Sequence, residues 1–507
     1  MRKIFTSKQA KELDKMTMDA QGISSYELME RAVYELFATL EKRLGNVSSL
    51  KFIVIAGTGN NGGDGLGIAR LLKLRDADVK VWFCDYSDRI SEECKLNLEK
   101  LQHIDSKCVV SLRDIDIESL SIPSDSIVVD AIFGTGLSRS VEGRYAKLIK
   151  LINDSAVNVF SIDIPSGLFG EDNAGNAGEI IRASVTLKIQ DYSLSAMFAE
   201  NYKYYGDIDI IDINHDKKSI ETIESNFYCT EQQDVASILK KRQPFDHKGT
   251  YGHALLIAGA KGKAGAAVLA ARACMRSGVG LLTVHLPQEI CDIMQISIPE
   301  AMIDIDDDNN LQTKCLIREK YSAIGIGPGI GTDSKTFPLI ESVIQSKMPV
   351  VFDADALNII SENKHWSDSL SNCILTPHPK EFERLFGRYE SSLERINFMS
   401  DFSIKHNVAI VLKGGVSTIS LTDGNVLFYR GLNSGIATGG SGDVLTGIIT
   451  SLLAQGYCID DAASIGVWIH GEAGRTATEH KGCISTIASD IVENIPLAFK
   501  QLYELHI

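Results

Sequence analysis

A glycine-rich run at residues 57–65 is the first segment whose residue types and spacing suggest chemistry. It reads Gly57-Thr58-Gly59-Asn60-Asn61-Gly62-Gly63-Asp64-Gly65, between a β-branched run at 51–56 and a helix expected over 66–74. Unpaired N–H groups at a helix start bind anions, and glycines let the backbone approach a phosphate. The run therefore predicts a loop for a dinucleotide-like ligand; a purely structural turn is the alternative.

Two aspartates stand at the ends of further expected strands, and each precedes a short glycine loop. They are Asp130 and Asp163. Ligands of open α/β sheets bind beyond the carboxyl ends of the strands, so we expect both carboxylates near the first glycine loop. Asn61, Asp130 and Ser166 would then offer oxygen ligands that suit a hard cation. Either aspartate taken alone could instead cap a helix or lie in solvent.

The strongest signal for catalysis is Gly440-Ser441-Gly442-Asp443, which opens a helix expected over 441–454. Backbone N–H groups at this helix start form an anion hole, and Asp443 stands beside it. Such N–H groups stabilise a moving phosphoryl group, while a carboxylate takes the proton from the attacking hydroxyl. The segment predicts phosphoryl transfer, and it resembles the corresponding motif of ribokinase-type small-molecule kinases.

Three other segments refine this prediction. Residues 413–417 follow an expected strand and could cradle an adenine nucleotide through their backbone, and 325–331 is a second glycine-rich strand end. The segment 376–381 resembles the T-P-N-x-x-E segment of ribokinase-like enzymes, with His378 in place of Asn. A lone histidine is more often structural, but this one lies between two prolines at a strand end.

The elements that must position these motifs fall into two blocks in which β-branched runs alternate with helix-period segments. This alternation predicts parallel sheets flanked by helices. The first block begins with a helical stretch over 7–43, with Ser7 as its N-cap and a second start at Ser24. Its expected strands are 51–56, 78–83, 126–132, 158–164, 183–189 and 207–213.

The second block follows a polar cluster at 214–218. Its expected strands are 254–258, 281–286, 323–326, 350–353, 373–375, 409–412 and 416–420, and its long helices are 263–277, 335–346, 380–406, 441–454 and 460–478. We therefore predict an α/β chain, with a Rossmann-like, doubly wound domain over 1–220 and a second α/β domain over 225–507. The resemblance of the Gly440–Asp443 motif implies that the second domain is ribokinase-like.

The composition excludes several classes of protein. The chain has 507 residues, 44% hydrophobic and 23% charged, which is typical of two or three globular domains. A net charge of −15 argues against nucleic-acid binding. No run of about 18 apolar residues and no apolar signal segment is present, so we expect a cytoplasmic protein that contacts no membrane. The ten scattered cysteines form no C-x-x-C pair, which favours unreactive thiols and supports no zinc-ligand spacing.

Three segments of the first block are similar to the N-terminal domain of the hydrated-NAD(P)H repair proteins: GTGNNGGDG at 57–65, DAIFGTGLSR at 130–139 and DIPSGL at 163–168, after the entry stretch ELDKMTMDAQGISSYELMERA. That family epimerises the R and S forms of NADHX and NADPHX, cofactors hydrated at the nicotinamide ring. The resemblance implies that Asp163 is the catalytic acid/base and that Asn61, Asp130 and Ser166 hold K⁺. It implies substrate contacts from Asn60, Asn61, Gly62, Gly63, Asp64, Gly134, Thr135, Gly136, Leu137, Ser138, Arg139, Ser140 and Asp163.

The second block resembles the NAD(P)H-hydrate dehydratase branch of ribokinase-like proteins over about residues 230–505. The resemblance lies in KGTYGH at 248–253, KAGAA at 263–267 and TPHPKEFERL at 376–385. It implies that the hydrated nucleotide contacts Ala266, Gly329, His378 and Asp443. It implies that ADP, with Mg²⁺, is held by Lys413, Gly414, Gly415, Val416, Ser417 and Gly442.

The two resemblances predict one coherent pathway. Phosphorylation converts the ring hydroxyl, a poor leaving group, into a phosphate that is then eliminated, with Asp443 deprotonating the hydroxyl. The kinase-like domain takes only the S epimer, and the first domain supplies it from the R form. A fused chain is the prokaryotic arrangement, which favours ADP as donor and AMP and phosphate as products. The expected partners are these small molecules, and a homo-oligomer is expected.

Two other functions remain open at this point. One is a ribokinase-type kinase of a vitamin alcohol fused to a non-catalytic nucleotide-binding domain, which would release a stable phosphorylated alcohol. The other is a scaffold that uses the first fold for interactions only. That scaffold would require loss of the acid/base residue, and Asp163 is present.

Overall fold

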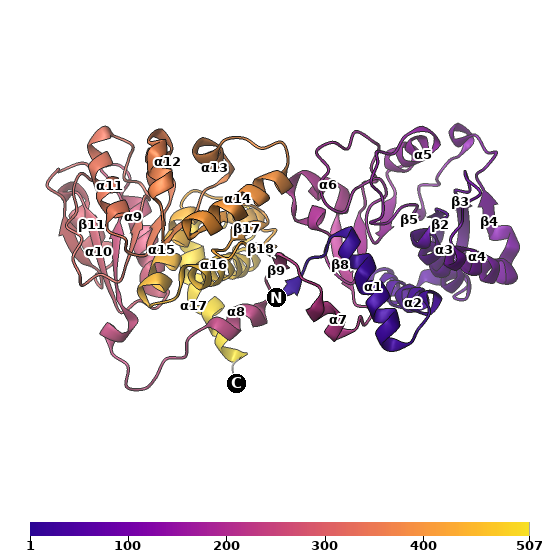
Figure 1. Ribbon diagram of the computed structural model, residues 1–507, viewed down its shortest axis with the longest axis horizontal. Coiled ribbons are helices and arrows are strands. Elements are labelled where there is room, and N and C mark those ends of the chain that lie inside the picture. The colour runs from indigo at the N-terminus through magenta and orange to yellow at the C-terminus, as the bar shows by residue number, and fades with distance from the viewer. Residues whose placement is uncertain (506–507) are drawn as a thin grey trace. The chain divides into compact units, whose positions relative to one another are not determined.

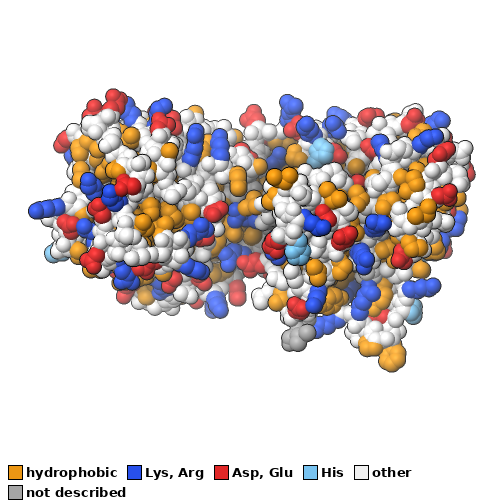
Figure 2. All heavy atoms as spheres, turned by 180° about the vertical axis from the view of Figure 1, so that it is seen from behind, with side chains coloured by type: hydrophobic (Ala, Val, Ile, Leu, Met, Phe, Trp, Pro, Cys, Tyr) orange, Lys and Arg blue, Asp and Glu red, His pale blue; other side chains and the backbone are white. Residues whose placement is uncertain are grey.

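The computed structural model describes residues 1–505, which divide into two compact units (Figure 1). The N-terminal unit comprises Lys3–Ser225 and Ser391–Leu393. The C-terminal unit comprises Met1–Arg2, Asn226–Glu390 and the described residues from Glu394 onward. Among the described helices, none is long and apolar enough to span a membrane. Basic and acidic side chains are intermixed on the visible surface of each unit (Figure 2).

The N-terminal unit is built on a seven-stranded parallel sheet with the strand order β4-β3-β2-β5-β6-β7-β8. The strands are β2 (Lys51–Ala56), β3 (Asp78–Phe83), β4 (Val109–Ser111), β5 (Ser126–Ala131), β6 (Asn158–Ile162), β7 (Val185–Ile189) and β8 (Asp207–Ile211). The order reverses between β2 and β5, which is where open α/β sheets bind their ligands. The predicted Rossmann-like class is confirmed; β4, only three residues long, was not predicted.

Helices flank this sheet. They are α1 (Ser7–Gln21), α2 (Ser25–Leu44), α3 (Asn60–Lys73), α4 (Glu92–Asp105), α5 (Gly143–Asp154) and the short α6 (Tyr202–Tyr205) and α7 (Lys217–Thr222). The helical stretch predicted over 7–43 is divided at Gly22, which has a left-handed conformation with φ of 65°. Prediction of Ser7 as the N-cap was wrong: Thr6 caps α1 through a capping box with Gln9. Ser24 caps α2 as expected.

Helix α3 begins at Asn60 rather than near residue 66, because its glycines allow the helix to approach its neighbours closely. A Cβ at Gly62 would lie 1.9 Å from the Gly57 carbonyl oxygen, and one at Gly65 would lie 2.4 Å from the Ala131 Cβ. Both distances are far inside van der Waals contact. The predicted loop is therefore shorter than expected, and Asn61 and Asp64 project from the first turns of a helix.

The C-terminal unit is built on an eleven-stranded sheet with the order β1-β9-β18-β17-β16-β15-β14-β13-β10-β11-β12. Its strands are β1 (Arg2–Lys3), β9 (Phe227–Cys229), β10 (His253–Ile257), β11 (Leu281–Leu286), β12 (Met302–Ile305), β13 (Ala323–Ile326), β14 (Val350–Phe352), β15 (Cys373–Leu375), β16 (Val408–Leu412), β17 (Ser417–Ser420) and β18 (Val426–Tyr429). The strands from β12 to β16 are parallel, and β17 is antiparallel to both its neighbours. The α/β class is confirmed; β1, β9, β12 and β18 were not predicted.

The helices of this unit are α8 (Gln232–Ile238), α9 (Ala264–Arg276), α10 (Cys291–Ser297), α11 (Phe337–Gln345), α12 (Ala354–Glu362), α13 (Pro379–Phe386), α14 (Ser392–His406), α15 (Ser441–Ala454), α16 (Ile459–Lys481) and α17 (Ala488–Glu504). The single helix predicted over 380–406 was wrong. It is two helices, because Gly387 ends α13 with a φ of 92°. Helices α12 and α17 were not predicted.

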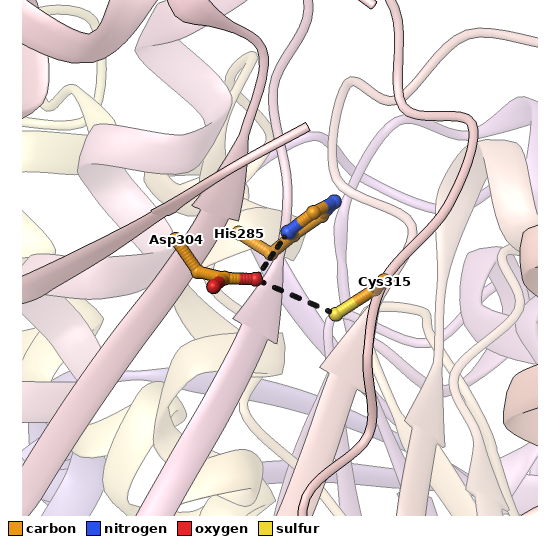
Figure 3. A group of neighbouring side chains, drawn as sticks. All are labelled: His285, Asp304 and Cys315. Atoms are coloured by element: carbon orange, nitrogen blue, oxygen red, sulfur yellow. Dashed lines mark hydrogen bonds and ion pairs between the residues drawn. The ribbon is translucent and has the colours of Figure 1, made fainter. Parts of the chain in front are cut away.

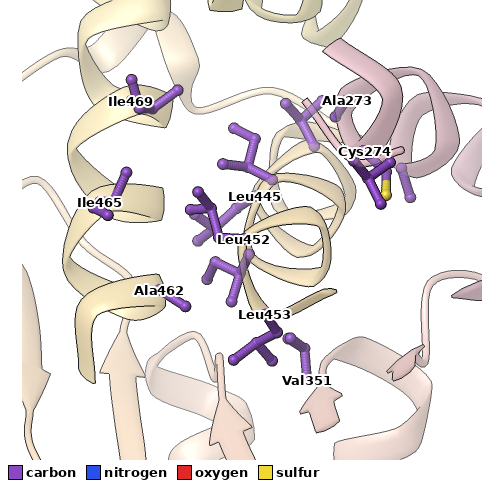
Figure 4. Packing of buried hydrophobic residues seen from close by; sticks show 14 of the residues in the cluster. Ala273, Cys274, Val351, Leu445, Leu452, Leu453, Ala462, Ile465 and Ile469 are labelled. Atoms are coloured by element: carbon purple, nitrogen blue, oxygen red, sulfur yellow. The ribbon is translucent and has the colours of Figure 1, made fainter. Parts of the chain in front are cut away.

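Helix α15, which carries the Gly440–Asp443 motif at its start, is the centre of the C-terminal core. Its apolar side chains pack against α9, α16 and β14 (Figure 4). Every residue from Val444 to Ala454 is buried. Such packing fixes the helix axis and therefore the direction of the N–H groups at its start.

Candidate functional site

The N-terminal unit contains a cavity of about 560 Å³ beyond the carboxyl ends of its strands. It lies at the reversal of strand order between β2 and β5, and loops after β2, β5, β6 and β7 contribute to it. The predicted site residues that line it are Asn60, Asn61, Asp64, Gly134, Thr135, Gly136, Leu137 and Asp163. The structure therefore brings three separate sequence motifs together at one edge of the sheet.

The remaining predicted residues of this site have other surroundings. Gly62 and Gly63 face inward, and a Cβ at Gly63 would lie 2.9 Å from the Met29 sulfur. Ser140 donates a hydrogen bond to Asn176 at 3.2 Å and lies outside the cavity lining, as do Ser138 and Arg139. Their substrate contacts stay predictions.

Asp163 has an unusual environment for a carboxylate at a strand end. Its φ is 64°, in the left-handed region that non-glycine residues rarely adopt. One carboxylate oxygen accepts a hydrogen bond from the Lys188 ammonium, and the other accepts one from the Thr135 N–H at 3.2 Å. The side chains of Asp163 and Lys188 are 13% and 8% exposed. Backbone strain held by surrounding structure is typical of functional sites.

Asp64 is a second carboxyl group at the cavity. Burial raises its pKa well above the ordinary value, and the nearby Asp163 and Asp14 raise it further. A neutral Asp64 can donate a hydrogen bond to a ligand, whereas the Lys188-paired Asp163 accepts.

Of the three predicted cation ligands, Asp130 and Ser166 contact each other, and Asn61 lines the cavity. The Ser166 hydroxyl donates to Asp130 at 2.5 Å, and the Ser166 N–H donates to the other carboxylate oxygen at 2.9 Å. Asp130 is fully buried. The side-chain oxygen and nitrogen of Asn61 are buried without a hydrogen-bond partner. Unpartnered amide oxygens and buried carboxylates are both ligand types that suit a hard cation.

In the C-terminal unit, Asp353 organises the motif at the start of α15. Its carboxylate accepts from Lys413 Nζ at 2.7 Å and from the Thr446 hydroxyl at 2.7 Å, and its side chain is 1% exposed. A Cβ at Gly442 would lie 3.3 Å from Lys413 Nζ. The lysine predicted to bind nucleotide therefore lies directly beside the predicted anion hole. Gly440 precedes the helix with a φ of 91°, a conformation that favours glycine.

Asp443 lies in the first turn of this helix, and its side chain is partly buried. Burial and the negative charge of Asp353 raise its pKa to about 6, although the positive charge of Lys413 opposes the shift. A pKa near the working pH suits a general base. His470 supports the same helix start, because its Nε2 lies 3.0 Å from the Ser441 hydroxyl, and burial lowers its pKa to about 4.

Two of the predicted hydrated-nucleotide contacts, Ala266 at the start of α9 and Gly329 in the loop after β13, are neighbours. A Cβ at Gly329 would lie 3.0 Å from the Ala266 Cβ, so these two residues are in contact. Lys263 forms an ion pair with Asp355 at 3.0 Å, and Asp355 also accepts from the Gly331 N–H at 2.8 Å. Asp355, in the first turn of α12, therefore connects the loop before α9 to the loop after β13.

His378 and the segment 413–417 have clear structural roles. His378 is the N-cap of α13: its Nδ1 accepts from the Lys380 N–H at 3.0 Å, and Glu381 accepts from the His378 N–H at 2.9 Å. Residues 413–416 form the turn between β16 and β17, and Ser417 begins β17. The contacts of these residues with substrate or nucleotide stay predictions.

Sequence reasoning missed several residues of both sites. Lys188 lies in the middle of a strand, and Asp353 and His470 belong to no glycine motif. Asp353 stands at the carboxyl end of a predicted strand, as Asp130 and Asp163 do. An aspartate in that position is a signal that could have identified it. The ion partner of Asp163 had no such signal, because strand pairing alone brings Lys188 to it.

Comparison with known proteins gives matches for both units. Residues 254–497 match the family described as NAD(P)H-hydrate dehydratase, and residues 25–192 match the family described as YjeF-related protein N-terminus. The chain is 31% identical to the bifunctional NAD(P)H-hydrate repair enzyme Nnr of Moorella thermoacetica, over 99% of this chain and 97% of that protein.

Two further relatives carry the same name. The protein of Coxiella burnetii is 31% identical, and the match covers 97% of this chain and 98% of that protein. The protein of Escherichia coli is 29% identical, and the match covers 94% of this chain and 90% of that protein. Among solved structures, the ADP/ATP-dependent NAD(P)H-hydrate dehydratase of Bacillus subtilis, co-crystallised with ATP and Mg²⁺, is similar with a TM-score of 0.48. It is 28% identical and covers 54% of this chain and 98% of that one.

Proposed function

The chain belongs to the family of bifunctional NAD(P)H-hydrate repair enzymes, and on that premise we propose which unit performs each step and which residues act in it. The N-terminal unit interconverts the R and S forms of hydrated NADH and NADPH. The C-terminal unit then dehydrates the S form in a nucleotide-dependent reaction. The assignment rests on two separate sites, one centred on Asp163 and the other on Asp443.

In the N-terminal unit, Asp163 is proposed as the acid/base group of epimerisation. Inversion at a hydroxyl-bearing ring carbon requires a proton to be moved at the ring, and a positioned carboxylate does this. Asp163 lines the cavity, and contacts from Lys188 and Thr135 fix its two oxygens. These contacts orient the carboxylate while leaving it at the cavity wall, which is the observation that carries this assignment.

We further propose that Asn61, Asp130 and Ser166 hold K⁺ beneath the cavity, where the ion would supply positive charge beside a bound substrate. Support comes from the unpartnered amide of Asn61. Epimerisation is expected to be faster in K⁺ than in Li⁺ at equal ionic strength, because the smaller ion does not fit the same oxygen ligands. The comparison is made with dehydration as the control activity. Equal epimerisation rates in the two salts would contradict the assignment.

In the C-terminal unit, Asp443 is proposed to take the proton from the ring hydroxyl of the S form. The hydroxyl oxygen attacks the terminal phosphoryl group of the nucleotide, and the N–H groups of 440–443 stabilise the negative charge that develops. The bond between the ring carbon and the phosphate oxygen then breaks and phosphate leaves with the bonding electrons. The adjacent ring carbon loses a proton to water, which restores the dihydropyridine ring. ADP with Mg²⁺ supplies the phosphoryl group when bound, held by residues 413–417 and Gly442, and AMP is the second product.

The experiment that tests the whole proposal supplies mixed R and S NADHX with either ADP or ATP. Complete recovery of dihydronicotinamide absorbance, with one AMP and one phosphate released per molecule repaired, is the expected result with ADP. A stable phosphorylated product without recovery of absorbance would instead indicate an ordinary small-molecule kinase. Recovery of only the S half would indicate an N-terminal unit without epimerase activity.

The pKa of Asp443 predicts the pH dependence of dehydration. Below about pH 6 the carboxyl group is protonated and cannot accept the hydroxyl proton, so kcat/KM is expected to fall about tenfold per pH unit there. Lys413→Met removes a positive charge that lowers the pKa of Asp443. The fall of kcat/KM at acid pH should therefore begin at a higher pH in this variant. The pH profile of kcat/KM with pure S substrate measures both effects. If kcat/KM fell at the same pH in the variant as in the wild type, the assignment of Asp443 as the base would be contradicted.

A further inference from the structure

A cluster of three possible metal ligands lies in the C-terminal unit, apart from the residues assigned above. His285 on β11, Asp304 on β12 and Cys315 in the segment after β12 point toward one another (Figure 3). Parallel pairing of β11 with β12 places His285 opposite Asp304. The ligand-type atoms of the three side chains all lie within 4.8 Å of one another.

We propose that His285, Asp304 and Cys315 form a Zn²⁺ site, with water as the fourth ligand. Imidazole nitrogen, carboxylate oxygen and thiolate sulfur are the ligands that Zn²⁺ takes, and three protein ligands leave one tetrahedral position open. Sequence spacing did not reveal the site, because its ligands are not in one short motif but are brought together by strand pairing.

The distances in the cluster are close to those of a tetrahedral site. His285 Nδ1 lies 2.9 Å from Asp304 Oδ2, and Cys315 Sγ lies 4.0 Å from the same oxygen. Zinc–ligand bonds of about 2.0–2.3 Å require separations of roughly 3.3–3.7 Å between the ligand atoms. Small side-chain rotations reach this geometry. The Asp304 side chain is 24% exposed, which gives an ion and its water access from solvent.

The second nitrogen of His285 has the partner that a metal-binding histidine needs. Nε2 lies 3.0 Å from Asp306 Oδ2, in a side chain with 0% exposure. A carboxylate bonded to the far nitrogen fixes the ring orientation and raises the basicity of the other nitrogen. Asp306 is itself immobilised by N–H groups of Asp308, Thr313 and Lys314 at 2.7–3.0 Å.

The same network holds Cys315 in place. Thr313 and Lys314, whose N–H groups donate to Asp306, immediately precede it. The Gln312 amide donates to the carbonyls of Ala258, Gly259 and His285 at 2.9–3.0 Å. A bound ion would therefore join β11, β12 and the segment 312–315 at a single point.

The charges around the cluster balance when the ion is bound. Zn²⁺ neutralises the Cys315 thiolate and the Asp304 carboxylate, and Arg318, 3.7 Å from Asp304 Oδ1, offsets the charge of Asp306. Binding then displaces two protons, one from the Cys315 thiol and one from His285 Nδ1, which donates to the Asp304 carboxylate when no ion is bound. Metal binding that depends on a preformed set of ligands also stabilises the folded state.

The test is a titration of the chelator-treated, reduced full-length chain with Co²⁺, a spectroscopic substitute for Zn²⁺. We expect a thiolate-to-cobalt charge-transfer band that saturates at one ion per chain and disappears when Zn²⁺ is added, because Zn²⁺ binds more tightly. Cys315→Ser is expected to lose the band, whereas Cys483→Ser, which alters an exposed thiol, should keep it. Asp306→Asn is expected to weaken Co²⁺ binding by about 10–100-fold.

A second readout protects the test against a variant that fails to fold. Zn²⁺ should raise the melting temperature of the wild-type chain but not that of Asp304→Asn, a substitution at a partly exposed position. No saturable band in the wild type would overturn the proposal. A band that survives in Cys315→Ser but is lost in Cys483→Ser would also overturn it, since binding would then occur at the exposed thiol.

Discussion

Replacing Asp443 with Asn is expected to abolish dehydration while leaving epimerisation at the wild-type rate. An amide cannot accept the hydroxyl proton, and a general base contributes about 10²–10⁴-fold to the rate. The epimerase site is built entirely from residues of the other unit, so the substitution does not alter it. Recovery of absorbance from pure S substrate with ADP measures dehydration, and R-to-S conversion measures epimerisation.

The melting temperature distinguishes loss of the base in Asp443→Asn from a folding defect. Burial raises the pKa of Asp443 to about 6, so the ionised group is unfavourable in the folded chain above that pH. Its contribution to stability is present at low pH and lost as the pH rises through about 6. Asp443→Asn removes that unfavourable charge, and its melting temperature at pH 7 should be no lower than that of the wild type. Wild-type dehydration by the variant would refute the proposed mechanism.

Asp163→Ala is expected to stop epimerisation only. With pure S substrate, repair should proceed at the normal rate. With a mixed pool, it should stall once the S half is consumed, apart from slow spontaneous interconversion. Two sites in separate units that share no residue should respond nearly independently. The time course of absorbance with each pool is the measurement.

The control for this variant is Lys188→Met, which removes the ion partner and retains the carboxylate. It should slow epimerisation less than Asp163→Ala does, because the Thr135 N–H still orients the carboxylate. Circular dichroism verifies that both variants fold. A proportional loss of both activities in folded Asp163→Ala would indicate one shared site instead of two.

Glycine motifs at strand ends were the most informative part of the sequence. Alternating runs predicted the parallel sheets, and the rule that ligands bind beyond strand ends placed Asn61, Asp130 and Asp163 at one edge. The structure confirms that Asn61 and Asp163 line one cavity, whereas Asp130 is fully buried and accepts from Ser166. This placement follows from local pattern, because each motif adjoins its own strand.

Features that depend on distant pairing were beyond prediction. Lys188 reaches Asp163 only because β7 lies beside β6, and β12 and β18 are short segments whose pairing partners the sequence does not identify. The start of α3 was predicted at residue 66 instead of Asn60 because contacts with distant residues are also invisible in the sequence. Glycines normally indicate a loop, whereas close contacts with Gly57, Ala131 and Val33 here require glycine inside a helix.

These glycines also bear on the order in which the chain folds. Each glycine inside a helix disfavours it by about 0.8–1.0 kcal/mol relative to alanine, and α3 contains Gly62, Gly63, Gly65 and Gly67. The segment would therefore be largely non-helical in an unfolded chain and acquires its shape only once β2, β5 and α2 enclose it. We infer that the anion-binding edge of the N-terminal unit is completed late in folding, so that its amides gain protection from hydrogen exchange after those of the sheet. A nascent or partly unfolded chain would then have an assembled sheet before it has any capacity to bind the damaged cofactor.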